Sequence, residues 1–105
     1  MIHIENMEHF KTVISEGVTL VDFYANWCGP CRMLSPFVEE IDEEYKDRAK
    51  IVKVDVDECG DVASQYNINA IPALLIFKNN ELVNTNIGFI PKEDMKKLLD
   101  EALSE

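Results

Sequence analysis

Short apolar runs alternate with amphipathic stretches along this chain, and the alternation limits its fold more than any other feature of the sequence. Residues 18–24 and 50–56 are rich in β-branched and aromatic side chains, which is typical of strands covered on both faces. Residues 31–45, between them, predict a long crossover helix that joins two neighbouring parallel strands. Its predicted apolar face consists of Met33, Leu34, Phe37, Val38, Ile41 and Tyr45.

Three further segments have helical patterns. Residues 7–15, after a capping Asn6, and residues 60–66 predict shorter helices. Residues 92–103 predict a surface helix that begins after Pro91. Predicted helices therefore alternate with predicted strands along the chain.

Two strand patterns close the alternation. Residues 73–78 and 82–88 are separated by Asn79-Asn80-Glu81, which predicts a hairpin turn because asparagine tolerates left-handed backbone angles. The last two strands should therefore be antiparallel. The order β-α-β-α-β-α-β-β-α predicts an α/β fold of three layers, in which about four helices cover both faces of a central mixed sheet of about five strands.

Composition and charge narrow the class of protein. The 105 residues, 47% hydrophobic and 29% charged, fit one globular domain with its own core. The longest apolar stretches, residues 18–25 and 71–77, are too short to span a bilayer, and the first residues lack a signal-peptide pattern. The net charge of -10 repels nucleic acid and anionic membranes. We expect one cytoplasmic, monomeric domain over residues 1–105, with neither nucleic acid nor a membrane as its partner.

Cys28 and Cys31 stand where the strand 18–24 gives way to the long helix. Residues at i and i+3 of a helix have Cβ atoms about 5 to 6 Å apart, which allows a disulfide with slight strain. The free N–H groups and positive dipole end of a helix start stabilise an anionic sulfur and lower a cysteine pKa. We predict that Cys28, the first and more exposed of the two, is the nucleophile and that Cys31 is the resolving thiol.

Gly29 and Pro30 separate the two cysteines. Pro30 has no N–H to lose at a helix start and stiffens the turn, while Gly29 lets a partner backbone approach Cys28. Neither residue is charged, whereas a histidine at this place would make the pair more oxidising. The motif therefore favours a reductant.

A Cys-x-x-Cys pair can also be half of a zinc site or a haem attachment. Zinc would need two more ligands at comparable spacing, but the sequence offers only Cys59, His3 and His9 elsewhere. Haem attachment would need a histidine directly after the pair, where Arg32 stands. Three cysteines, an odd number, also argue against a disulfide framework of the kind found in secreted proteins. A redox pair without a metal is the favoured interpretation.

Residues 21–31, Val-Asp-Phe-Tyr-Ala-Asn-Trp-Cys-Gly-Pro-Cys, resemble the active-site segment of the thioredoxin family. The resemblance continues, in the family's order, through Pro36, residues 53–57, Ile71-Pro72, residues 77–79 and Gly88. It implies the thioredoxin fold and a protein-disulfide reductase that cycles between dithiol and disulfide through a mixed disulfide, with no bound cofactor. The implied partners are disulfide-containing client proteins and a thioredoxin reductase that restores the dithiol. Such a protein would carry electrons in cell redox homeostasis.

Asp22 and Lys53 are the implied proton-handling residues. Asp22 interrupts an apolar strand, where burial should raise its pKa, although it could instead point to water from the strand edge. The resemblance implies that it exchanges a proton with Cys31 in the second step. Lys53 matches the family lysine that approaches this aspartate and tunes it; a strand lysine extending to water is the alternative.

The resemblance also implies a docking surface beside the cysteines. Trp27 resembles the tryptophan that flanks the disulfide, and Pro72 the cis-proline that lies against it. Ile71 matches the residue whose backbone pairs with an extended substrate segment. Gly88 matches a glycine that keeps the surface flat. Pro36, inside the long helix, should remove one hydrogen bond and bend the axis, which is a structural role.

Several residues fall outside the motif. Cys59 has no counterpart in it, and its acidic neighbours disfavour a thiolate, so we expect a weakly reactive thiol. The family more commonly has glycine, threonine and glycine at Ala70, Ala73 and Asn80, which bears on loop detail and partner preference. Two other functions stay open: a redox-independent binding subunit, or an oxidase or isomerase with a higher reduction potential.

Overall fold

The computed structural model describes residues 1–104, and its helices and strands follow the predicted order. The strands are β1 (Ile2–His3), β2 (Val18–Tyr24), β3 (Ala49–Asp55), β4 (Ala73–Lys78) and β5 (Glu81–Ile87). The helices are α1 (Met7–Ile14), α2 (Gly29–Tyr45), α3 (Gly60–Gln65) and α4 (Lys92–Leu103). The predicted bounds of β2, β4 and α4 are confirmed. The bounds predicted for β3, β5, α1, α2 and α3 differ from the structure by one or two residues at one or both ends, and no bounds were predicted for β1.

The strands of the described chain form one mixed sheet in the order β1-β3-β2-β4-β5. β3 is parallel to both β1 and β2, β4 is antiparallel to β2, and β5 is antiparallel to β4. The predicted parallel pair and the predicted hairpin are therefore confirmed. Asn79 and Asn80 make the hairpin turn with φ values of 49° and 77°, whereas Glu81 already belongs to β5.

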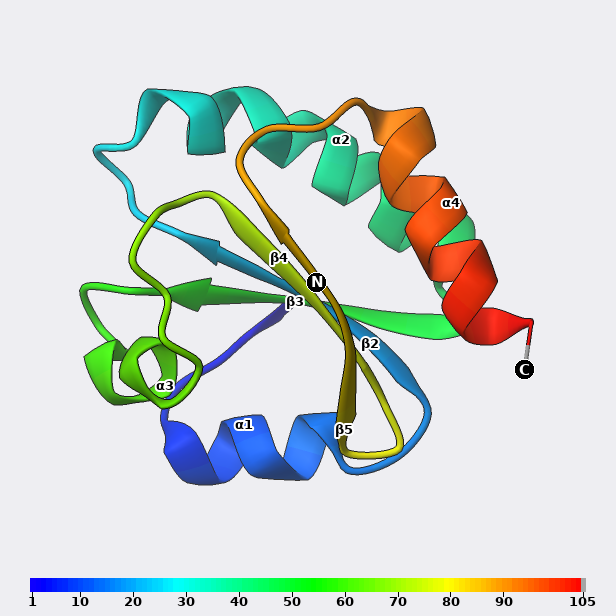
Figure 1. The fold of residues 1–105 in the computed structure, drawn as a ribbon, viewed down its shortest axis with the longest axis horizontal. Coiled ribbons are helices and arrows are strands. Elements are labelled where there is room, and N and C mark those ends of the chain that lie inside the picture. The colour runs from blue at the N-terminus through cyan, green and yellow to red at the C-terminus, as the bar shows by residue number, and fades with distance from the viewer. Residues whose placement is uncertain (105) are drawn as a thin grey trace.

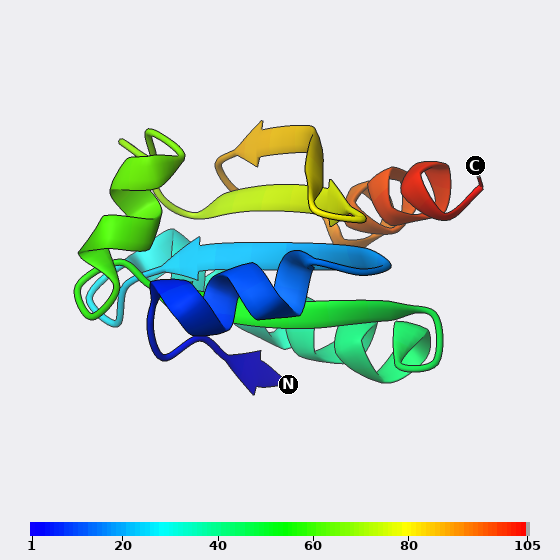
Figure 2. The same ribbon diagram turned by 90° about the horizontal axis from the view of Figure 1, so that it is seen from below.

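Helices cover both faces of the sheet, which gives three layers (Figures 1 and 2). One core cluster joins the sheet to α1 and α3 and includes Phe10 and Val62. The other joins the sheet to α2 and α4 and includes Leu34 and Leu99. β2 is buried along its length between the two cores, so the residues that follow it start from a fixed point. Within residues 1–104 no helix is long and apolar enough to cross a membrane.

Met33 corrects the predicted apolar face of α2. Its side chain is 66% exposed, whereas Leu34, Val38, Ile41 and Tyr45 are buried against the sheet. Each residue turns a helix by about 100°, so a stripe centred on the buried positions turns Met33 outward. The stripe is therefore narrower at the start of α2 than the sequence predicts.

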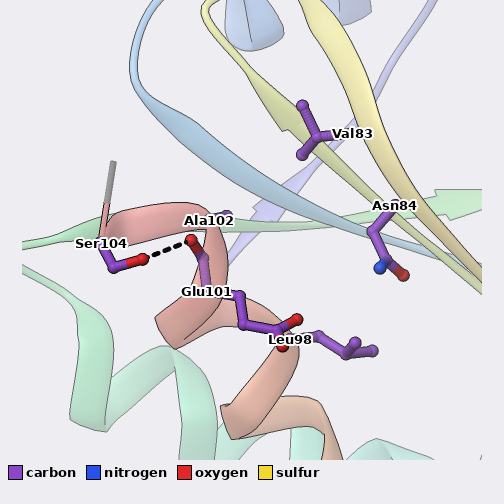
Figure 3. A pocket seen from close by; sticks show the side chains of 6 residues that line it. All are labelled: Val83, Asn84, Leu98, Glu101, Ala102 and Ser104. Carbon is purple, nitrogen blue, oxygen red and sulfur yellow. Dashed lines mark hydrogen bonds between the residues drawn. The ribbon is translucent and has the colours of Figure 1, made fainter.

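A hollow of about 380 Å³ lies between β5 and the last turn of α4 (Figure 3). This end of α4 is far from the first turn of α2 (Figure 1). The residues that line it are Val83, Asn84, Leu98, Glu101, Ala102 and Ser104. The Ser104 hydroxyl donates a hydrogen bond to the Glu101 carbonyl oxygen at 2.8 Å. None of these side chains is a thiol or an imidazole, so the candidate chemistry lies elsewhere.

Thr19 is buried at the second position of β2, and its Oγ1 has no hydrogen-bond partner within residues 1–104. A buried hydroxyl without a partner costs free energy, while valine has nearly the same shape and nothing to desolvate. We expect Thr19→Val to raise the free energy of unfolding by about 1 kcal/mol in urea titrations. Thr85→Val, on the exposed strand β5, is the control and should change it far less. A lower stability of Thr19→Val would contradict the prediction.

Candidate functional site

The two cysteines lie at the start of α2. This helix follows the central strand β2 along the chain (Figure 1). Cys28 is the N-cap residue, and its Sγ accepts a hydrogen bond from the Cys31 backbone N–H at 3.3 Å. Cys28 and Cys31 form a disulfide with a Cα–Cα distance of 5.3 Å, within the usual range for such bonds. α2 begins at Gly29, two residues earlier than predicted, because Pro30 fits the first helical turn. The free N–H groups of this turn favour an anionic sulfur at Cys28.

Exposure does not distinguish the two cysteines, contrary to the prediction that Cys28 is the more exposed. Cys28 is 5% exposed and Cys31 is 4% exposed. Both pack with Ala25, against the partly buried side chains of Val56 and Ile71. The neighbouring loops therefore cover Cys28 as closely as the helix covers Cys31. What separates them is their position, since Cys28 caps α2 and Cys31 lies inside it.

Asp22 is buried in β2, at 1% exposure, on the face that α2 covers. Its Oδ1 has no hydrogen-bond partner within residues 1–104. Burial raises the pKa of its carboxyl from 3.8 to about 6, and the positive charge of Lys53 offsets part of the rise. The predicted burial and the predicted direction of the pKa shift are confirmed. A carboxyl with this pKa can hold or release a proton near neutral pH.

Lys53 stands opposite Asp22 in the register of β2 and β3. Its Nζ lies 4.3 Å from the centroid of the Tyr24 ring and donates a hydrogen bond to Ser35 Oγ at 3.3 Å. A cavity of about 140 Å³ is lined by Lys53, Tyr24 and Ser35 together with Cys31 and Arg32. The approach of Lys53 to Asp22 is thus through space, without an ion pair among the described residues.

Lys53→Met should raise the pKa of Asp22 above about 6, because it removes the charge that favours the carboxylate. We expect a rise of roughly one unit, measured from the ¹³C chemical shift of the Asp22 carboxyl as pH is varied. Lys11→Met, on α1, removes a lysine charge far from Asp22 and should leave the pKa of Asp22 unchanged. An unchanged or lowered pKa in Lys53→Met would refute the assignment of Lys53.

The predicted docking residues lie beside the cysteines. Trp27 is 69% exposed, and its Nε1 donates a hydrogen bond to Asp57 Oδ2 at 2.9 Å. The peptide bond between Ile71 and Pro72 is cis, as the resemblance implies, and the Ile71 carbonyl oxygen lies 3.9 Å from Cys28 Sγ. Gly88 donates its N–H to the Pro72 carbonyl oxygen at 2.8 Å.

Gly88 has a φ of +98°, in the region that favours glycine. A larger residue there would strain the backbone beside Pro72, whose carbonyl oxygen Gly88 binds. The backbone conformation therefore accounts for glycine at this position, and its role in keeping the surface flat stays a prediction.

Three residues of the site were not predicted. Asp57 fixes the indole of Trp27, and Tyr24 and Ser35 contact the Lys53 ammonium group. Tyr24 and Lys53 are 29 positions apart in the sequence, and only the strand register brings them together. A parallel β2–β3 pair with a known register would have been needed to find the contact.

Cys59 lies apart from this site. It is buried, and its Sγ lies 3.5 Å from the Ile4 carbonyl oxygen. Burial raises the pKa of its thiol, and the charges of Asp61, Glu58 and Asp55 add to the rise. The prediction that the surroundings of Cys59 disfavour its thiolate form is confirmed.

Comparison with known proteins gives one family. The Thioredoxin family model matches residues 1–101. A thioredoxin of Bacillus subtilis (strain 168) is 48% identical over 96 residues, which cover 91% of this chain and 92% of the relative. A thioredoxin of Staphylococcus aureus (strain N315) is 44% identical over 94 residues, which cover 90% of each chain.

Solved structures agree with the sequence comparisons. A mutant thioredoxin from Halobacterium salinarum NRC-1 superposes with a TM-score of 0.92 at 34% identity, covering 99% of this chain and 91% of that one. Plasmodium falciparum thioredoxin superposes with a TM-score of 0.89 at 33% identity, covering 96% of this chain and 98% of that one. Fold and sequence thus point to the same group of proteins.

Proposed function

This chain belongs to the thioredoxin family of protein-disulfide oxidoreductases, and from that membership we propose how its own residues divide the reaction. Cys28 attacks the client disulfide, and Cys31 resolves the mixed disulfide. The observation that carries this assignment is the position of Cys28 Sγ, which caps α2 and accepts the Cys31 N–H. Such a sulfur is favoured as the thiolate, which is the nucleophile in thiol–disulfide exchange.

Two exchanges complete the reaction. The Cys28 thiolate forms a bond to one client sulfur, the client S–S bond breaks, and the leaving client thiolate takes a proton. The Cys31 thiolate then forms a bond to Cys28 Sγ, which breaks the mixed disulfide and releases the second client sulfur as a thiolate that also takes a proton. The dithiol is oxidised by two electrons to the Cys28–Cys31 disulfide, and the client disulfide is reduced to two thiols.

Asp22 exchanges the proton of Cys31 in the second step, and Lys53 adjusts the proton affinity of Asp22. The buried carboxyl with a pKa of about 6 supports this role, because it can accept a thiol proton at neutral pH. Gly29 and Pro30 tune the redox pair without adding charge.

Trp27, Ile71, Pro72 and Gly88 form the docking surface for an extended client segment. The exposed indole, the Ile71 carbonyl oxygen close to Cys28 Sγ, and the hydrogen bond between Gly88 and Pro72 support this assignment. The backbone of Ile71 would pair with the client in strand fashion.

We infer the cellular setting from the same membership. A thioredoxin reductase returns the disulfide to the dithiol, so that the chain carries electrons between this enzyme and its clients in cell redox homeostasis. The protein acts in the cytoplasm as a monomer, with residues 1–105 as a single domain.

Reduction of insulin tests the proposed direction of the reaction. Small amounts of the protein should accelerate the reduction of insulin disulfides by dithiothreitol, and titration against glutathione should give a reduction potential below that of the glutathione couple. A potential well above glutathione would favour an oxidase or isomerase. No acceleration at all would favour a binding subunit.

A further inference from the structure

The Lys53 ammonium group lies against the ring of Tyr24 and not against the carboxylate of Asp22. Its Nζ is 4.3 Å from the ring centroid, a distance at which the aromatic face attracts a cation. The same Nζ donates a hydrogen bond to Ser35 Oγ at 3.3 Å. Two neutral side chains, one from β2 and one from α2, therefore hold this cation.

Asp22 is the carboxylate that Lys53 would be expected to bind. The two residues are paired in the register of β2 and β3, and paired residues on neighbouring strands point to the same face of a sheet. Across the described residues, however, they form no ion pair, and Asp22 Oδ1 has no hydrogen-bond partner. The charge of Lys53 still acts on Asp22 through space. Lys53 is thus close to Asp22 but held apart from it.

The other groups around Asp22 and Lys53 offer no competing carboxylate contact to the cation. α2 contributes Cys31, Ser35 and Arg32 to the cavity, and β4 places Leu74 opposite Asp22. Two further acids, Asp55 and Glu58, act through space on the Tyr24 phenol, and neither forms an ion pair with Lys53 among the described residues.

The Tyr24 phenol stays neutral over the range in which Asp22 titrates. Burial raises the pKa of this phenol above its usual value, and the charges of Asp55, Glu58, Asp22 and Cys59 add to the rise. The ring therefore keeps its attraction for the cation at every pH at which the reaction would run.

We propose that Tyr24 is a positioning residue: its ring, together with Ser35, holds the Lys53 ammonium group beside Cys31 and out of contact with Asp22. This inference rests on the proposed role of Asp22 in proton exchange with Cys31. An opposite charge in direct contact would stabilise the carboxylate and weaken its hold on a proton. The ring thereby keeps Asp22 in a state that can both take up and return a proton near neutral pH.

Removal of the ring tests the proposal. In Tyr24→Leu, the Lys53 side chain is free to move to Asp22, so the pKa of Asp22 should fall by about one unit, followed by ¹³C NMR of its carboxyl. Tyr24→Phe keeps the aromatic face and loses only the hydroxyl, so its Asp22 titration should stay as in the wild type. Ser35→Ala removes the other contact on the same ammonium group and should shift the pKa in the same direction by less.

The background Lys53→Met shows whether Tyr24 acts through the lysine. There Tyr24→Leu should no longer lower the pKa of Asp22, because no cation remains to be released. An equal fall in both backgrounds would overturn the proposal, since it would show that the ring acts by excluding water. An unchanged or raised pKa in Tyr24→Leu alone would also overturn it. If Tyr24→Leu does not fold, Ser35→Ala in the two backgrounds decides the question by the same criteria.

The proposed role of Asp22 is measured separately, from the pH dependence of mixed-disulfide resolution in the wild type and in Asp22→Asn. If the rate of resolution depends on the Asp22 carboxyl but the pKa of Asp22 is unchanged in Tyr24→Leu, only the positioning role of Tyr24 fails. If resolution is the same with and without the Asp22 carboxyl, the proton-exchange role fails whatever Tyr24 does.

Discussion

Cys28→Ser is expected to lower insulin reduction to the uncatalysed background. A serine hydroxyl is not ionised near neutral pH and cannot form the mixed disulfide, so the helix N-terminus that favours a thiolate has no sulfur to act on. Cys31 keeps its thiol, but it lies inside α2 and does not cap the helix, so it lacks the position that makes Cys28 the nucleophile at the client disulfide. Full activity in Cys28→Ser would refute the assignment of the nucleophile.

Cys31→Ser should stop the same reaction one step later. Cys28 can still attack, but no second thiol is placed to resolve the product, so the protein should accumulate as a mixed disulfide with its client. Mass spectrometry of the denatured adduct distinguishes this outcome from that of Cys28→Ser, which should form none. Cys59→Ser is the matched control, because its thiol is buried and its pKa is raised. It should reduce insulin as the wild type does.

The order of elements could be predicted because each depends on a local pattern. Asn79 and Asn80 supply the positive φ values of the hairpin turn, and residues 18–24 alternate between two cores on a strand that is buried on both faces. Such signals reside in a few consecutive side chains. The bounds of β2, β4 and α4 therefore follow from the sequence without any knowledge of tertiary contacts.

The site was predicted less completely because its details depend on contacts between distant elements. Met33 has an apolar side chain at helical spacing, yet it points away from the buried stripe of α2 and is exposed. The burial of Cys28 comes from Val56 and Ile71, which belong to other loops. The position of Lys53 against Tyr24 requires the β2–β3 register. None of these contacts leaves a periodic signal in the sequence.

Asp22→Asn is expected to stabilise the protein and to slow it at the same time. At neutral pH the wild type keeps a carboxylate in an apolar interior without an ion pair among the described residues, whereas asparagine has the same shape and no charge. It should also lower the rate of mixed-disulfide resolution at pH 7 by about a hundredfold, because Cys31 loses its proton acceptor. Stability and activity should thus move in opposite directions, as is common at functional sites.

The difference in stability between the wild type and Asp22→Asn should depend on pH, and the raised pKa of Asp22 fixes the direction of that dependence. The pKa of Asp22 is raised from 3.8 in the unfolded chain to about 6 in the fold, so the folded protein binds the proton more tightly. Below pH 3.8 the stability that the protonated carboxyl contributes to the fold is fully present, and it is lost as pH rises through about 6. The wild type should therefore lose about 3 kcal/mol relative to Asp22→Asn across that window, and no more above it.

Urea titrations of the wild type and Asp22→Asn at a series of pH values measure this difference in stability. The contributions of all other titrating groups are the same in both proteins and cancel in the difference. Asp47→Asn, at an exposed position, is the control and should show no comparable dependence. A stability difference that stays constant between pH 3.8 and 6 would mean that Asp22 keeps an ordinary pKa in the fold. In that case its carboxylate would be too weak a base to take up the Cys31 proton near neutral pH, and the proposed role of Asp22 would fail.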